Sequence, residues 1–152
     1  MTVPFVLVLV AIASVGGAVR AERTAGDLRL EMSVARGVFQ VGEPVHISLR
    51  VSNISGTPVT LTSGGQQYDV IVRQRGALVW QWSHDKGFAQ VVRSVEMAPG
   101  DARTYKASWD QRDLQGRPVE PGTYEVSCVL LAAQRSGPAS VEVGPVRITI
   151  AR

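Results

Sequence analysis

Apolar and polar residues alternate along most of this chain, and the pattern is clearest between Gly64 and Gln90. Two segments there place an apolar or aromatic residue at every second position: Tyr68, Val70 and Val72, then Leu78, Trp80 and Trp82. A turn at Arg75-Gly76 separates them. Period-two runs of β-branched and aromatic residues around a glycine turn predict a β-hairpin. Because alternate residues of a strand share a face, we expect Trp80 and Trp82 to be buried beside Leu78, with the rest of the fold packed on them.

The same alternation predicts further strands along the chain. Residues 91–97 are ambiguous, because Phe88, Val91, Val92 and Val95 also fit helical spacing, but their β-branched content favours a strand. Turn residues separate the segments at short intervals, without a strand–helix–strand alternation. We therefore predict an all-β, two-sheet antiparallel sandwich of about eight or nine strands. The other predicted strands cover 28–34, 45–52, 59–62, 104–109, 124–131 and 141–150, the last as one strand or a pair.

The N-terminus has a different character. Residues 2–15 form an uncharged apolar run, and small residues follow it up to Ala21. A short apolar core that ends in small residues predicts a secretory signal peptide, cleaved after Ala21 or Ala18. No Lys or Arg precedes the run, so an uncleaved membrane anchor is the alternative. We expect a signal peptide or anchor at 1–21, a polar linker at 23–26, a mature domain at 22–152, and a secreted, periplasmic or cell-envelope protein.

The composition and charge of the chain exclude some classes of binding partner. The chain has 152 residues, 45% of them hydrophobic and 19% charged, with 15 Gly and 8 Pro, which suits one turn-rich globular domain. Its formal net charge of +3 is not concentrated in a basic run. Nucleic acid is therefore not an expected partner, and a membrane would be contacted only through an uncleaved N-terminal segment.

Candidate catalytic chemistry is sparse. The sequence holds no nucleophile-elbow, zinc-protease or phosphate-loop motif, so we predict a protein that is not an enzyme. His46 and His84 lack spaced partners, so neither a metal nor another cofactor is expected. Cys128 alternates in phase with apolar residues and is expected in the core. Asp69 is expected to form a surface ion pair, with Arg73 or a cross-strand partner.

Several motifs occur in an order that resembles a known family. They are Gln67-Tyr68-Asp69, Val79-Trp80-x-Trp82-Ser83, Phe88-x-Gln90, Met97-Ala98-Pro99-Gly100, Trp109 and Pro121-Gly122-Thr123-Tyr124. From about Gly42 to Leu131 the chain resembles the BsuPI type of bacterial intracellular proteinase inhibitor. The resemblance implies an immunoglobulin-like β-sandwich and, as for the founding member, inhibition of a serine protease. Fold alone does not fix function, so a family member need not inhibit a protease.

A second, local resemblance covers Trp109 to Tyr124. This part is similar to the end of other bacterial immunoglobulin-like modules, such as those of the flagellar hook-cap family. It implies that Asp113 and Gly116 shape a turn, and that Tyr124 anchors the next strand in the manner of a tyrosine corner. The three tryptophans are alternatively an exposed aromatic platform for a ligand, but their apolar neighbours favour the core.

Two polar loops are the candidate partner-binding sites. The first presents His84, Asp85 and Lys86, and the second presents Arg112, Leu114 and Arg117. Leu114 is an apolar residue in a polar loop, of the kind that a subtilisin-like pocket accepts. We expect an exported protein-binding sandwich that inhibits a serine protease through one of these loops. The alternative is a non-inhibitory structural or interaction module of the cell envelope.

Overall fold

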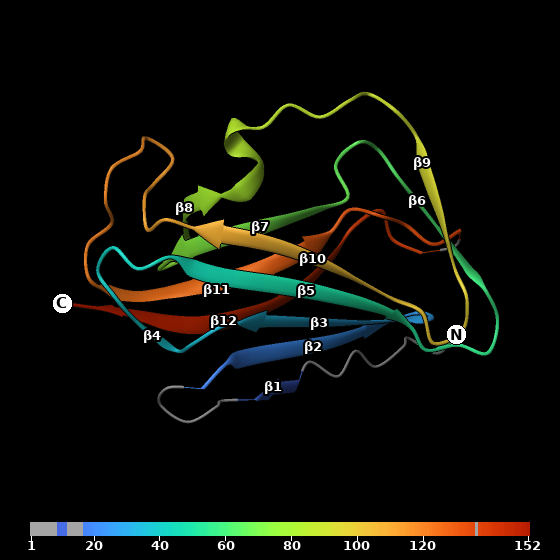
Figure 1. Ribbon diagram of the computed structural model, residues 1–152, viewed down its shortest axis with the longest axis horizontal. Helices are drawn as coiled ribbons and strands as arrows, with labels where there is room; N and C mark the ends of the chain where they lie inside the picture. The colour runs from blue at the N-terminus through green and yellow to red at the C-terminus, as the bar shows by residue number, and fades with distance from the viewer. Residues whose placement is uncertain (1–8, 12–16, 136) are drawn as a thin grey trace.

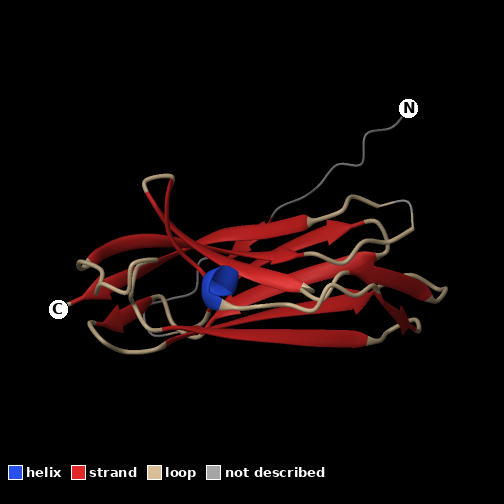
Figure 2. Ribbon diagram, turned by 90° about the horizontal axis from the view of Figure 1, so that it is seen from above, coloured by secondary structure: helices blue, strands red, loops and turns tan. Residues whose placement is uncertain are grey.

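Two five-stranded sheets face each other in the protein, whose computed structural model describes residues 9–11, 17–135 and 137–152 (Figures 1 and 2). The strand order is β1-β2-β3-β5-β10 in one sheet and β4-β12-β11-β7-β8 in the other, while β6 and β9 form a separate pair. All pairs are antiparallel except β4 with β12. The predicted all-β sandwich is confirmed.

The first sheet consists of β1 (Leu9–Ala11), β2 (Val19–Ala25), β3 (Leu28–Val34), β5 (Val45–Asn53) and β10 (Ala102–Trp109). The second consists of β4 (Val38–Gln40), β12 (Val141–Ala151), β11 (Gly122–Leu130), β7 (Tyr68–Gln74) and β8 (Ala77–Gln81). The remaining pair is β6 (Val59–Ser63) and β9 (Arg93–Met97), and η1 is a 3-10 helix at Trp82–Asp85.

The alternation in the sequence becomes the two faces of each strand. In β5, Val45, Ile47, Leu49 and Val51 are buried, whereas His46 and Arg50 on the opposite face are exposed. The core lies between the inner faces of the two sheets, because each sheet is apolar on one side only. This pattern was predicted for β5 and is confirmed.

Strand β11 lies inside its sheet, between β12 and β7, and is buried along most of its length. Cys128 has 0% exposure, as predicted for a core residue. Burial raises the pKa of its thiol to about 12, because the thiolate would have to leave water. A thiol in this state is a poor nucleophile, so it packs as a small apolar side chain.

The β7–β8 hairpin forms where it was predicted. Arg75 and Gly76 both have positive φ, 52° and 79°, which is the geometry of a tight two-residue hairpin turn. The prediction for Leu78 is wrong, because the β7–β8 pairing shifts register between Val72 and Arg73, and Leu78 is 47% exposed. Trp80 is buried, as expected.

The N-terminal part of the domain contains a strand that the sequence pattern did not show. Strand β2 pairs with β3 over its whole length, and Val19 and Ala21 are buried. The polar linker predicted at 23–26 is therefore wrong, because most of it continues β2. The predicted signal peptide falls largely on residues 1–8 and 12–16, outside the described residues, and it stays a prediction. Cleavage after Ala21 would remove three residues from β2.

Candidate partner-binding site

The first candidate loop is folded as η1 and the residue after it. The backbone N–H of Lys86 donates to the Ser83 carbonyl at 3.1 Å, and the His84 Nδ1 lies 2.7 Å from the Gln81 carbonyl oxygen. The His84 ring also meets the Trp80 ring edge-on, with 6.4 Å between centroids. Local contacts therefore hold the loop in a single compact turn.

Asp69 is the residue that organises this turn, and the predicted surface ion pair is wrong. The residue is 4% exposed, and its carboxylate accepts hydrogen bonds from Gln81 Nε2 at 2.7 Å and Ser83 Oγ at 2.6 Å. It also accepts from the backbone N–H groups of Ser83 at 3.1 Å and Val70 at 2.9 Å. Arg73 instead pairs with Glu142, at 3.1 Å. A buried carboxylate is stable here because four donors replace its water.

The charged groups at the tip bind one another. Lys86 Nζ lies 3.3 Å from the Asp85 carboxylate and 4.7 Å from the centroid of the Trp82 ring. The hydrogen bond from Lys86 lowers the pKa of Asp85, so this carboxylate is charged at neutral pH. The Asp85 side chain is 65% exposed, and it is the part of the turn most accessible to a partner.

The second candidate loop is a small hairpin built around Asp113. The carboxylate of Asp113 accepts from the backbone N–H groups of Gln115 and Arg117, both at 2.9 Å. The Gly116 N–H donates to the Asp113 carbonyl at 3.0 Å, and Gly116 has φ of 79°, which favours glycine. The predicted turn roles of Asp113 and Gly116 are confirmed.

Leu114 is only partly available at the surface. Its backbone N–H donates to the Val79 carbonyl at 3.1 Å, so the loop is docked on the outer edge of β8, and the side chain is half-buried. Arg112 and Arg117 are exposed, although Arg112 Nη1 donates to the Gly116 carbonyl at 2.9 Å. The two arginines are thus the accessible side chains among the three predicted contacts of this loop.

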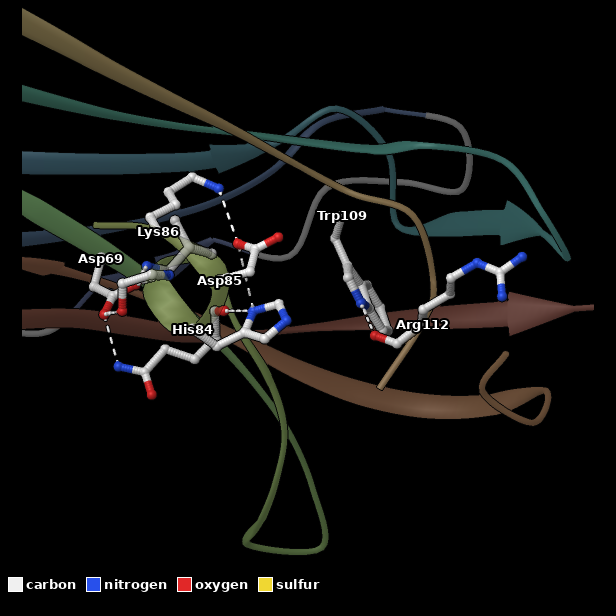
Figure 3. Close-up of polar contacts among 9 residues, drawn as sticks. Asp69, His84, Asp85, Lys86, Trp109 and Arg112 are labelled. Atoms are coloured by element: carbon white, nitrogen blue, oxygen red, sulfur yellow. Dashed lines mark hydrogen bonds and ion pairs between the residues drawn. The ribbon is translucent and has the colours of Figure 1, made fainter. Parts of the chain in front are cut away.

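A tryptophan pair connects the two loops, as Figure 3 shows with Trp109 between His84 and Arg112. The Trp109 Nε1–H donates to the Arg112 carbonyl at 2.8 Å, and its ring lies 6.2 Å from that of Trp80. Trp80, in turn, contacts His84. The structure therefore brings the two candidate loops to the same end of the molecule.

The start of the following strand is anchored as predicted. Tyr124 is buried, and its hydroxyl donates to the Glu120 carbonyl, four residues upstream, which confirms the tyrosine corner. Burial raises the pKa of the Tyr124 hydroxyl. Its ring packs on Trp109, so the corner also supports the second loop.

Trp82 differs from the other two tryptophans. Trp109 is 0% and Trp80 7% exposed, and both are core residues, but Trp82 is only partly buried. Strand β8 ends at Gln81, so Trp82 belongs to η1 and stacks on Tyr68, with 4.4 Å between ring centroids. The prediction that Trp82 is a core residue is therefore wrong.

A comparison with known protein families identifies the family of this chain. The model of the BsuPI family, described as intracellular proteinase inhibitor, matches residues 32–135, more than half of the chain. The chain belongs to the BsuPI family. The family is one of proteinase inhibitors, which indicates a protein partner of protease type.

The family also corrects one prediction. A secreted, periplasmic or cell-envelope location was expected from the apolar N-terminal run, whereas the matching family is described as intracellular. The predicted location is therefore wrong, since it was inferred from the apolar run alone and the family match over residues 32–135 points elsewhere. In the described ranges, no helix has the length and apolar character that a membrane span requires.

No curated protein matches this BsuPI-family chain in sequence. Several solved structures match parts of the chain at low identity. A β-glucosidase from Erythrobacter marinus is 17% identical, with a TM-score of 0.46, over 79% of this chain and 15% of the glucosidase. The CARDB domain of a Pyrococcus furiosus protein, in complex with di-metal ions, is 16% identical, with a TM-score of 0.48, over 82% and 92% of the two chains.

An alkylpurine DNA glycosylase from Pseudomonas fluorescens, bound to DNA, is 14% identical, with a TM-score of 0.46, over 83% of this chain and 31% of the glycosylase. This chain thus spans only a small part of both enzymes, and likenesses at this level carry no activity over to it. Within the described residues, no group of three or more His, Cys, Asp or Glu side chains is placed to hold a metal ion.

Proposed function

We propose that this BsuPI-family protein inhibits a serine protease of the subtilisin type by binding it through exposed loops, without chemistry of its own. The observation that carries the proposal is the family match over residues 32–135. Inhibition by binding requires a surface that is already in its bound shape, because ordering a loop on binding costs free energy. The hydrogen-bonded turns at both candidate loops meet this requirement.

The surface that we propose combines the two loops at the β8 end. A stable contact with a protease buries on the order of 800 Å² per partner, more than one loop tip supplies. His84, Asp85 and Lys86 would contribute one part of this area, and Arg112, Leu114 and Arg117 the other. Because Trp80 and Trp109 connect the loops, one partner can touch both without rearranging the core.

Within this surface we assign different roles to the side chains. Asp85, Arg112 and Arg117 are exposed and would make polar contacts at the rim. Leu114 offers the accessible half of its side chain as an apolar contact, while its backbone keeps the loop on β8. Rim charges mainly affect the association rate and its salt dependence, whereas a packed apolar contact affects dissociation.

The test is a titration of the full-length chain against a subtilisin-like and a trypsin-like protease. We expect inhibition of the first at one-to-one stoichiometry and weaker inhibition, or none, of the second. Leu114→Gly and Lys86→Ala should each weaken inhibition, with Thr60→Ala, an exposed residue on β6, as the control. Inhibition untouched by both substitutions would discard the loop assignment. No inhibition of either protease would leave a non-inhibitory interaction module.

A further inference from the structure

An apolar segment beside the first loop is exposed to solvent. Residues 86–92 connect η1 to β9 without regular secondary structure. Figure 1 shows this connection as a long loop along the edge of the molecule. Phe88, Val91 and Val92 are 36%, 44% and 81% exposed, and Val92 is the most exposed large hydrophobic residue in the described part of the chain. Apolar side chains gathered at the surface commonly mark a contact with a partner.

The segment is nevertheless held in place at its centre. A Cβ atom added to Gly65 would lie 2.1 Å from the Ala89 carbonyl oxygen, so the two backbones touch there. The Val91 N–H donates to the same Ala89 carbonyl at 3.0 Å. At the far end, β9 begins with Arg93 paired to Ser63 of β6. Such a segment loses little conformational freedom on binding.

Aromatic rings fix the beginning of the segment to the sheets. The Phe88 ring lies 5.9 Å from that of Trp82, which stacks on Tyr68, whose ring in turn is 4.8 Å from that of Tyr105 on β10. Lys86, where the segment starts, has an extended backbone, with φ of −112° and ψ of 143°. Phe88 is thus anchored on one side, whereas Val92 projects into solvent.

From these contacts, and resting on the proposed protease inhibition, we infer that residues 88–92 enter the substrate cleft of the protease, with Val92 in its specificity pocket. An exposed loop segment that a rigid scaffold holds in place is a common means of binding a partner, and residues 88–92 have this form.

The chemistry of the segment defines the class of protease. Residues 87–92 contain no charged side chain, so the pocket that receives Val92 is apolar rather than acidic at its base. The nearest cation upstream, Lys86, is already paired with Asp85 and lies over Trp82. Arg93, the exposed residue that follows Val92, is the first residue of β9 and pairs with Ser63, so it lies outside the segment. A subtilisin-like enzyme that accepts apolar residues fits a pocket filled by Val92.

The inference is tested by the inhibition constant of the full-length chain against a subtilisin-like protease. Val92→Asp and Phe88→Asp place a charge where the apolar pocket would close on the segment. We expect Val92→Asp to raise the inhibition constant by about 30-fold or more, as for a residue at the centre of an interface. Val41→Asp is the matched control, because Val41 is 52% exposed and lies in another loop, and it should leave inhibition unchanged.

A second pair of variants moves the segment without changing its surface. Gly65→Ala would push the Ala89 carbonyl away, while Gly56→Ala is its control, since no atom lies within 4 Å of a Cβ at that position. We expect Gly65→Ala to weaken inhibition by about tenfold or more and Gly56→Ala to have no effect. Melting temperatures show which variants remain folded. If Gly65→Ala does not fold, the inhibition constants of Val92→Asp and Phe88→Asp test the inference without it.

The outcomes separate this inference from the proposed function. A wild-type chain that inhibits no protease overturns the proposed function and this inference with it. Inhibition by the wild type that Val92→Asp and Phe88→Asp leave unchanged overturns the inference alone. Cleavage of the segment without inhibition, seen by mass spectrometry, also overturns it, because the segment is then a substrate. So does a change in self-association with unchanged inhibition, because the segment then joins two copies of the chain.

Discussion

Replacing Asp69 by asparagine tests whether a buried carboxylate organises the first loop. In the wild type, one carboxylate oxygen accepts from the backbone N–H groups of Val70 and Ser83, and the other accepts from Gln81 Nε2 and Ser83 Oγ. Asparagine keeps the shape and one oxygen, but its NH₂ group cannot accept. Two of the four hydrogen bonds are therefore lost or must be rebuilt by rotation of the Gln81 amide and the Ser83 hydroxyl.

The size of the effect follows from the kinds of bond involved. A hydrogen bond to a charged group contributes about 1.5–3 kcal/mol to stability. In the variant, half-buried donors can bind water instead, which offsets part of the lost stability. Gln81 and Ser83 are both half-buried. We expect Asp69→Asn to lower the free energy of unfolding by about 2 kcal/mol, and Asp69→Ala, which removes all four acceptor contacts, by about 4 kcal/mol. Both variants should still fold, because domains of this size are stable by about 5–15 kcal/mol.

Urea unfolding followed by tryptophan fluorescence measures these differences, with unchanged m-values as the condition for comparing midpoints. Asp110→Asn is the control, because the Asp110 side chain is 70% exposed, and it should change stability by less than about 0.5 kcal/mol. Ser83→Ala combined with Asp69→Asn should be non-additive by at least about 0.5 kcal/mol. An Asp69→Asn variant as stable as the wild type, or strict additivity with Ser83→Ala, would refute the role of Asp69.

The other predictions concern the core and the N-terminus. Cys128 should not react with a thiol reagent until urea unfolds the chain, because it is fully buried; reaction in native buffer would contradict its placement. Burial raises its pKa from 9.0 to about 12, so its contribution to stability is complete below pH 9.0 and is lost as pH rises toward about 12. Cys128→Ala should remove this part of the alkaline loss, measured by urea unfolding at both ends of that range. Trp109→Ala should cost about 3–5 kcal/mol in the same assay, and a much smaller loss would mean that the side chain is not buried as described. Deleting residues 1–21 should cost about 2 kcal/mol or more, because it removes buried Val19 from β2, and an unchanged melting temperature would show that β2 does not need it.

Features that depend on neighbouring residues along the chain could be predicted from the sequence. The alternation in β5 specifies a strand with one apolar face, because a strand has a period of two. Arg75-Gly76 specifies the hairpin turn, because glycine tolerates positive φ. The anchoring role of Tyr124 could be predicted from its local resemblance to other modules, because the hydrogen-bond acceptor, the Glu120 carbonyl, lies only four residues upstream.

Features that depend on distant partners were missed or predicted wrongly. Strand β2 carries only two buried apolar residues in alternation, Val19 and Ala21, so nothing in its own sequence separates it from a linker. Leu78 follows the apolar pattern of its neighbours, but a register shift against β7 leaves it exposed. Such a shift is set by the pairing of two strands and leaves no mark within either one.

The candidate site divides in the same way. The residue types in the two polar loops, and the turn at Asp113 and Gly116, could be predicted from the sequence, since turn chemistry is local. Long-range packing places the loops at one end of the molecule, docks Leu114 on β8 and buries Asp69 under η1, and none of these follows from the local sequence. The exposure of Val92 has the same origin, because the burial of an apolar side chain depends on which strands pass over it, and the path of the chain after η1 leaves Val92 uncovered.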